Sequence, residues 1–221
     1  MLPFTQAQFF AVFAEYNAAV WPAQVVAYLL GVAAMVLLIR PAAWSGRALG
    51  VGLGVLWLWT GVAYHGLHFA AINRAALAFA VLFVVQGLAL LAAGALGRLH
   101  FDRRGGVGAW VGWLLIVYAM AVYPLIGVAV GHTAIELPAF GITPCPLTLF
   151  TFGVLLLATR PLPWWLLAVP LVWSLIGGSA AFLLRVPQDW LLLFSGLGVA
   201  TWLYRARSRG TAMSAPRAAG H

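Results

Sequence analysis

Long apolar runs alternate along the chain with short connections that hold most of its charged residues. A bilayer core about 30 Å thick needs roughly 20 apolar residues of helix, and most of the runs have that length. The pattern therefore predicts an all-α, polytopic membrane helix bundle that forms a single transmembrane domain over residues 1–204. The seven predicted spans are 22–39, 48–71, 75–97, 107–131, 146–159, 163–183 and 188–204.

Two further segments flank these spans. Residues 4–18 place Phe9, Phe13 and Tyr16 at helical spacing, so this stretch is predicted to lie in the outer membrane interface or to extend the first span. Residues 205–221 are small, polar and basic. That composition is typical of a disordered cytoplasmic tail that is loosely attracted to anionic lipid.

Composition excludes a soluble multi-helix protein. Hydrophobic residues make up 64% of the chain and charged residues only 7%, so such a protein would have too little polar surface to offer water. The predicted partner of the outer helix faces is therefore the lipid bilayer. The oligomeric state does not follow from composition.

The distribution of charge predicts the direction of the spans. All 12 basic residues are arginines, and counting the connections alternately puts ten on one side and two, Arg74 and Arg185, on the other. By the positive-inside rule the C-terminus is cytoplasmic and the N-terminus lies outside. This topology accounts for the net charge of +8 without nucleic acid. A retinal photoreceptor is excluded because its Schiff base requires a lysine.

The fifth span is predicted to be interrupted. Residues 146–159 would cover only about 21 Å as a helix, which is less than the thickness of the bilayer core. Proline is favoured at the first helical position, so Pro146 is expected to begin the helix, with Cys145 as its cap and Pro144 in non-helical backbone. Broken helices recur at the substrate sites of transporters. The alternative is a simple kink with an inert cysteine.

Several candidate ligands are expected near the outer boundary of the membrane. His65 and His68 share a helix face, about 10 Å and 6 Å below that boundary, and Cys145 lies at about 9 Å. His132 and Glu136 lie on the loop that leads to Cys145. This set suits a divalent or soft metal ion such as zinc or copper. Alternatively, the histidines are neutral and hydrogen-bonded to neighbouring helices.

Other features have structural interpretations. Gly46, Gly50 and Gly54 recur every fourth residue, which lets a neighbouring helix approach closely. Gln86 is expected to form an interhelical hydrogen bond. The tryptophans near the ends of the spans are predicted to be interface anchors.

The stretches "YHGLHFAAINRAA" and "GHTAIELPAFGITPCPLTLFTFG" resemble an uncharacterised family of bacterial multi-pass inner-membrane proteins. The resemblance implies a bacterial cytoplasmic membrane and brings no reaction with it. It marks Tyr64, His65, Asn73, His132 and Cys145.

These observations leave three functions open. The first is a transporter or carrier of a small solute or soft metal ion, captured at an outward-facing His/Cys site. The second is a membrane enzyme that depends on a metal, haem or quinone. Against a seven-span zinc hydrolase, Asp102 and Asp189 both fall in predicted loops. The third is a subunit without catalytic activity.

Overall fold

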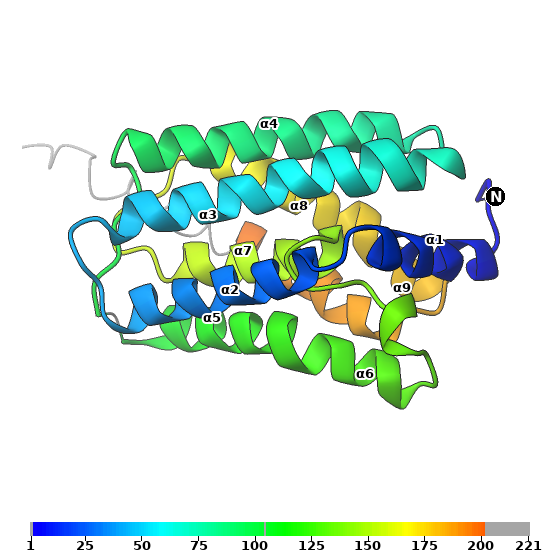
Figure 1. Ribbon diagram of the computed structural model, residues 1–221. Coiled ribbons are helices and arrows are strands. Elements are labelled where there is room, and N and C mark those ends of the chain that lie inside the picture. The colour runs from blue at the N-terminus through cyan, green and yellow to red at the C-terminus, as the bar shows by residue number, and fades with distance from the viewer. Residues whose placement is uncertain (1, 104, 202–221) are drawn as a thin grey trace, which may run out of the picture.

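The computed structural model describes residues 2–103 and 105–201, and these residues form helices and no strands, which confirms the predicted all-α fold. The longer helices pack into a bundle (Figure 1). The helices are α1 Gln6–Ala19, α2 Ala23–Ile39, α3 Ser45–Trp59, η1 Thr60–His68, η2 Phe69–Ala71, α4 Ala76–Ala95, α5 Val107–Val117, η3 Tyr118–Val122, α6 Tyr123–Ala129, η4 Ala134–Glu136, α7 Pro144–Leu156, α8 Trp165–Gly178, α9 Ala180–Leu183, η5 Pro187–Asp189 and a last stretch over 190–201.

Two of the long helices contain π-helical turns. The π-helical η1 joins α3 to the short 3-10 helix η2, and η3 joins α5 to α6 in the same way. The resulting continuous helices, Ser45–Ala71 and Val107–Ala129, agree closely with the predicted spans 48–71 and 107–131. Single π-helical turns are frequent at functional sites, which directs attention to the ends of these helices.

Four helical stretches among the described residues are long and apolar enough to cross a bilayer, and α1 with α2 makes a fifth if that bent pair counts as one span. Their outward faces carry many exposed apolar side chains, such as Leu29 and Val32 of α2. The helices are therefore compatible with a membrane location. The seven crossings remain a prediction. The four stretches are Ser45–Ala71, Ala76–Ala95, Val107–Ala129 and Trp165–Leu183.

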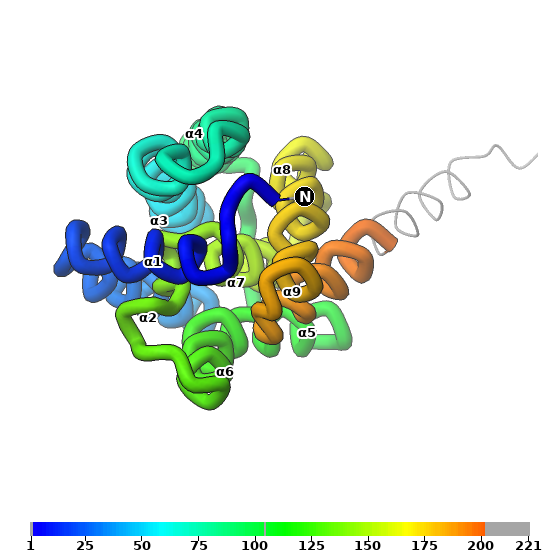
Figure 2. Tube along the Cα trace, turned by 90° about the vertical axis from the view of Figure 1, so that its right-hand side faces the viewer, coloured from blue at the N-terminus to red at the C-terminus, as the bar shows by residue number. Residues whose placement is uncertain are grey.

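Helix α7 lies at the centre of the bundle, surrounded by the longer helices (Figure 2). All of its 13 residues are buried. The helix is short, as expected, but it begins earlier than predicted. Thr143 has extended backbone at the N-cap and Pro144 is the first helical residue, so Cys145 belongs to the first turn and is not the cap. A proline suits this first position because its missing N–H has no partner to lose there.

Glycines allow the closest helix contacts. A Cβ at Gly50 of α3 would lie 2.7 Å from Cα of Gly94 in α4, so the predicted close approach along this glycine series is confirmed. A Cβ at Gly153 of α7 would lie 2.7 Å from the carbonyl oxygen of Gly112 in α5. Backbones therefore touch on two sides of the bundle.

Helix α1 lies across one end of the bundle (Figure 2) and makes an angle of 87° with α2, so it is not a straight extension of the first span. It buries Phe9, Phe13 and Tyr16 against the other helices. The Tyr16 hydroxyl donates a hydrogen bond of 2.8 Å to the carbonyl oxygen of Ile142. Helix α1 thereby fixes the loop that leads into α7.

The connections separate into two sets at opposite ends of the bundle (Figure 1). Residues 40–44, 96–103, 105–106 and 157–164 lie at one end, and this set holds most of the described arginines. The other end carries the connections with Arg74 and Arg185. The sequence predicted this separation when its connections were assigned alternately to the two sides of the membrane. The predicted tail, 205–221, lies outside the described residues.

Candidate functional site

A cavity of about 140 Å³ lies at the end of the bundle that α1 covers. Its wall is formed by the N-terminal segment, the end of η1 with η2, the start of α7 and the end of α8 with α9. Apolar and aromatic side chains dominate this wall. The aromatic ones are Phe4, Phe9, Tyr64, Phe69, Phe79 and Trp173.

Cys145 separates this cavity from a buried polar cluster. The cysteine lines the cavity, and its thiol hydrogen-bonds the carboxyl group of Asp189, which is only 2% exposed. The hydroxyl of Tyr123 donates a hydrogen bond of 2.6 Å to Oδ1 of the same carboxyl group. A buried carboxyl group needs such partners because an unpaired one is costly to remove from water. The three side chains therefore form one hydrogen-bonded unit behind the cavity.

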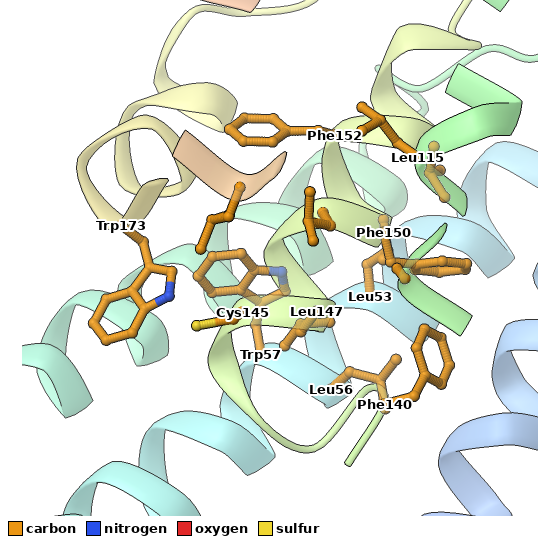
Figure 3. Packing of buried hydrophobic residues seen from close by; sticks show 14 of the residues in the cluster. Leu53, Leu56, Trp57, Leu115, Phe140, Cys145, Leu147, Phe150, Phe152 and Trp173 are labelled. Carbon is orange, nitrogen blue, oxygen red and sulfur yellow. The ribbon is translucent and has the colours of Figure 1, made fainter. Parts of the chain in front are cut away.

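Trp173 presents a polar group beside Cys145. Its side chain is 6% exposed, and its buried Nε1 atom has no oxygen or nitrogen partner and meets only the sulfur of Cys145. Figure 3 shows the indole nitrogen on the side of the ring that faces the sulfur of Cys145. One turn further along α8, a Cβ at Gly177 would lie 2.7 Å from this nitrogen. Any larger residue at that position would therefore press against this nitrogen.

The two histidines of η1 point to different surroundings. His65 is fully buried among the rings of Phe83 and Trp173, at centroid distances of 4.6 Å and 5.0 Å, and neither ring nitrogen has a partner. His68 is half-buried, and its Nδ1 lies 2.8 Å from the carbonyl oxygen of Ala63. The expected shared face assumed an α-helix. Because η1 is π-helical, its turns are wider and residues three apart no longer lie over one another.

His132 and Glu136 belong to the loop between α6 and α7. The His132 ring stacks on Phe10 with a centroid distance of 3.9 Å. Glu136 accepts hydrogen bonds from the hydroxyl and the backbone N–H of Thr133, at 2.7 Å and 2.9 Å. These bonds hold the pKa of the exposed Glu136 carboxyl below its ordinary value. His132 therefore ties the loop to α1, and Glu136 stabilises the loop locally.

The described residues lend no support to the predicted metal site. Among residues 2–103 and 105–201 no group of three or more His, Cys, Asp or Glu side chains is arranged to hold a metal ion. His65, His68, His132 and Cys145 do not converge. The reasons are the π-helical register of η1 and the stacking of His132 on α1.

The supporting residues divide into two groups. Tyr64, Asn73 and Pro144 line the cavity. Pro146 lies in the first turn of α7 and is buried. Gln86 donates from Nε2 to a backbone carbonyl of α8 at 2.8 Å, the interhelical contact expected of it.

Sequence reasoning missed three residues of this site. Asp189 was assigned to an outer loop, whereas η5 turns it into the bundle. Tyr123 lies within an apolar run and gives no signal of its partner. Trp173 is the one tryptophan in the middle of the predicted span 163–183. Its distance from both ends of that span is the signal that could have separated it from the interface anchors.

Comparison with known proteins adds a family and no activity. No curated protein and no solved structure matches the chain. One family model, described as a family of unknown function, matches residues 6–214, a range that includes Cys145, Trp173 and Asp189. The chain therefore belongs to the DUF6064 family.

Proposed function

We propose that this chain is a carrier of a small organic solute in a bacterial cytoplasmic membrane. It crosses the bilayer seven times, with the N-terminus outside. The solute binds in the cavity at Cys145. The arginine-rich connections lie at the end of the bundle opposite the cavity, and this supports the orientation because such connections usually face the cytoplasm. In this orientation the cavity lies at the outward end.

The cavity carries the proposal. Ligand sites are concave, mostly apolar and equipped with a few polar groups, and this wall combines aromatic rings with the thiol of Cys145 and the N–H of Trp173. A buried apolar cavity of about 150 Å³ is large enough for benzene. A volume of about 140 Å³ therefore suits a solute of similar size.

Two further features support a carrier. The cavity lies at the start of α7, a short helix that begins within the bundle, and helices of this kind build transporter sites at their broken ends. Asp189 provides a carboxyl group inside an apolar bundle, where ionisable side chains are expensive and usually functional.

The single cysteine makes a direct test available, because any thiol label on the native chain reports Cys145. A small, membrane-impermeant methanethiosulfonate reagent is added to intact cells and to inside-out vesicles. A carrier with alternating access should be labelled from both sides. Labelling only from outside would indicate a receptor that does not carry its ligand. Labelling from neither side, with the protein folded, would rule out an open site.

A filled cavity provides the control for this test. Ala180 lines the cavity, so Ala180→Phe should slow labelling of Cys145 by tenfold or more. The matched variant is Gly198→Phe, at an exposed helical position with open space around it, and it should leave the labelling rate unchanged.

The hydrogen-bonded Cys145 and Asp189 also favour a second candidate, a thiol-dependent acyl transferase. In such a reaction the Cys145 sulfur attacks the acyl carbonyl carbon of an ester as the thiol proton moves to the Asp189 carboxylate. The carbon–oxygen bond of the ester then breaks, and the departing alkoxide takes up that proton. Incubation with 4-nitrophenyl butyrate should then add one butyryl group to the intact protein and none to Cys145→Ala.

A further inference from the structure

We propose that the solute is a compact, uncharged molecule, about the size of one six-membered ring, with an oxygen acceptor that receives the indole N–H of Trp173. This inference rests on the proposed function and specifies the chemistry of its ligand. A cyclic ketone or a cyclic ether has these properties.

The need for an acceptor follows from Trp173. An indole nitrogen can only donate, so a buried indole is satisfied only by a hydrogen-bond acceptor. This nitrogen is buried and has no oxygen or nitrogen partner, and the ring lines the cavity. The sulfur of Cys145, which it faces in Figure 3, is at best a weak acceptor. A solute oxygen beside Cys145 would remove the cost of the unpaired donor.

Gly177 packs closely beside this donor. It also lines the cavity, and any larger residue would place its Cβ 2.7 Å from Nε1 of Trp173. Two other polar side chains of the wall have partners of their own. Asn73 accepts a hydrogen bond from the backbone N–H of Ala75 through Oδ1, and Ser179 donates its hydroxyl proton to the carbonyl oxygen of Ile176. Trp173 is the buried indole donor of this wall, and one acceptor on the solute satisfies it.

The wall also argues against a charged ligand. None of the side chains that line the cavity carries a charge, and the nearby Asp189 carboxyl group is occupied by Tyr123 and Cys145. An ion that entered would lose its hydration without gaining a counter-charge. Aromatic and aliphatic surfaces favour an uncharged ring instead.

The experiment measures protection of Cys145 from N-ethylmaleimide in the purified full-length chain. Cyclohexanone and methylcyclohexane are compared, because they are similar in size and only the ketone has an acceptor. The ratio of their half-protecting concentrations is determined for the native chain and for Trp173→Phe. Partition into detergent is the same for both proteins, so the change in the ratio isolates the N–H group. The control is Trp164→Phe, because Trp164 is exposed at the end of the bundle opposite the cavity.

The native chain should favour the ketone about tenfold more strongly than Trp173→Phe does, and Trp164→Phe should behave as the native chain. An unchanged ratio in Trp173→Phe would show that the Trp173 N–H does not donate to the ketone oxygen, and the inference would be wrong. Protection by both probes would still support a binding cavity. If neither probe protects an accessible Cys145, the proposed function fails as well.

A measurement on the unaltered chain covers the case in which Trp173→Phe does not fold. The chain is labelled with ¹⁵N-tryptophan, and its indole N–H proton resonances are recorded with each probe. Cyclohexanone should move one of them downfield and methylcyclohexane should not. If no resonance responds to the ketone alone, no indole N–H receives the oxygen and the inference is wrong.

Discussion

The hydroxyl of Tyr123 donates a hydrogen bond of 2.6 Å to Oδ1 of Asp189, which stands 66 positions further along the chain. Both side chains are buried. Since the same carboxyl group also bonds the thiol of Cys145, this contact joins α6, η5 and the first turn of α7. The polar side of the candidate site is therefore held by a contact between distant segments.

Removal of this hydrogen bond should destabilise the protein. Tyr123→Phe deletes the donor and leaves the buried Asp189 carboxyl with one partner fewer, so the free energy of unfolding should fall by about 1–3 kcal/mol. Thermal unfolding in detergent measures the effect. Tyr28→Phe is the control, because the Tyr28 hydroxyl bonds Met120 at a half-buried site and its loss should cost less. Equal losses for the two variants would contradict a special role for the Asp189 contact.

His65→Leu should stabilise the protein. Both ring nitrogens of His65 are buried without partners, and an apolar side chain of similar size removes that penalty. We expect the free energy of unfolding to rise by about 1–2 kcal/mol. His68→Leu removes a hydrogen bond of 2.8 Å to Ala63 and should be neutral or destabilising. A marked loss of stability in His65→Leu would show that the imidazole has a partner.

Gly153→Ala should separate α5 from α7. The added methyl group would lie 2.7 Å from the carbonyl oxygen of Gly112, and backbone cannot give way as a side chain does. Overpacking of this kind costs about 1–3 kcal/mol. Gly108→Ala, where no atom lies within 4 Å, should instead raise stability slightly by favouring the helix. Equal melting temperatures for the two variants would contradict the close α5–α7 contact.

The predicted orientation can be tested with single cysteines in a Cys145→Ala background. Ala134 and Ala43 are exposed in connections at opposite ends of the bundle. A membrane-impermeant maleimide should label Ala134→Cys in intact cells and Ala43→Cys only after lysis. The reverse pattern would invert the topology. Labelling of both from outside would exclude an odd number of crossings between them.

The long helices could be predicted because each one depends on local composition. The runs 48–71 and 107–131 needed only length and hydropathy, and the structure reproduces them to within a few residues. The start of α7 was predicted two residues late because the PCP sequence offers two prolines for the first helical position. The choice between them depends on the packing of the preceding loop.

The site could be predicted only in part. Cys145 was identified from the short helix that follows it, which is a local signal. The proposed companions His65 and His68 were placed by an assumed α-helical spacing, and the π-helical register of η1 breaks that assumption. The contact of Asp189 with Cys145 depends on tertiary folding, and no periodicity in one sequence encodes it.

The burial of α7 also has a consequence for how the family varies. A helix with one exposed face leaves a periodic record among homologues, because substitutions accumulate every third or fourth residue on that face. Helix α7 has no exposed face over its 13 residues. Homologous chains should therefore be similarly conserved on all sides of this helix. A scan of all substitutions should find that every position of the helix tolerates change poorly, without a helical period.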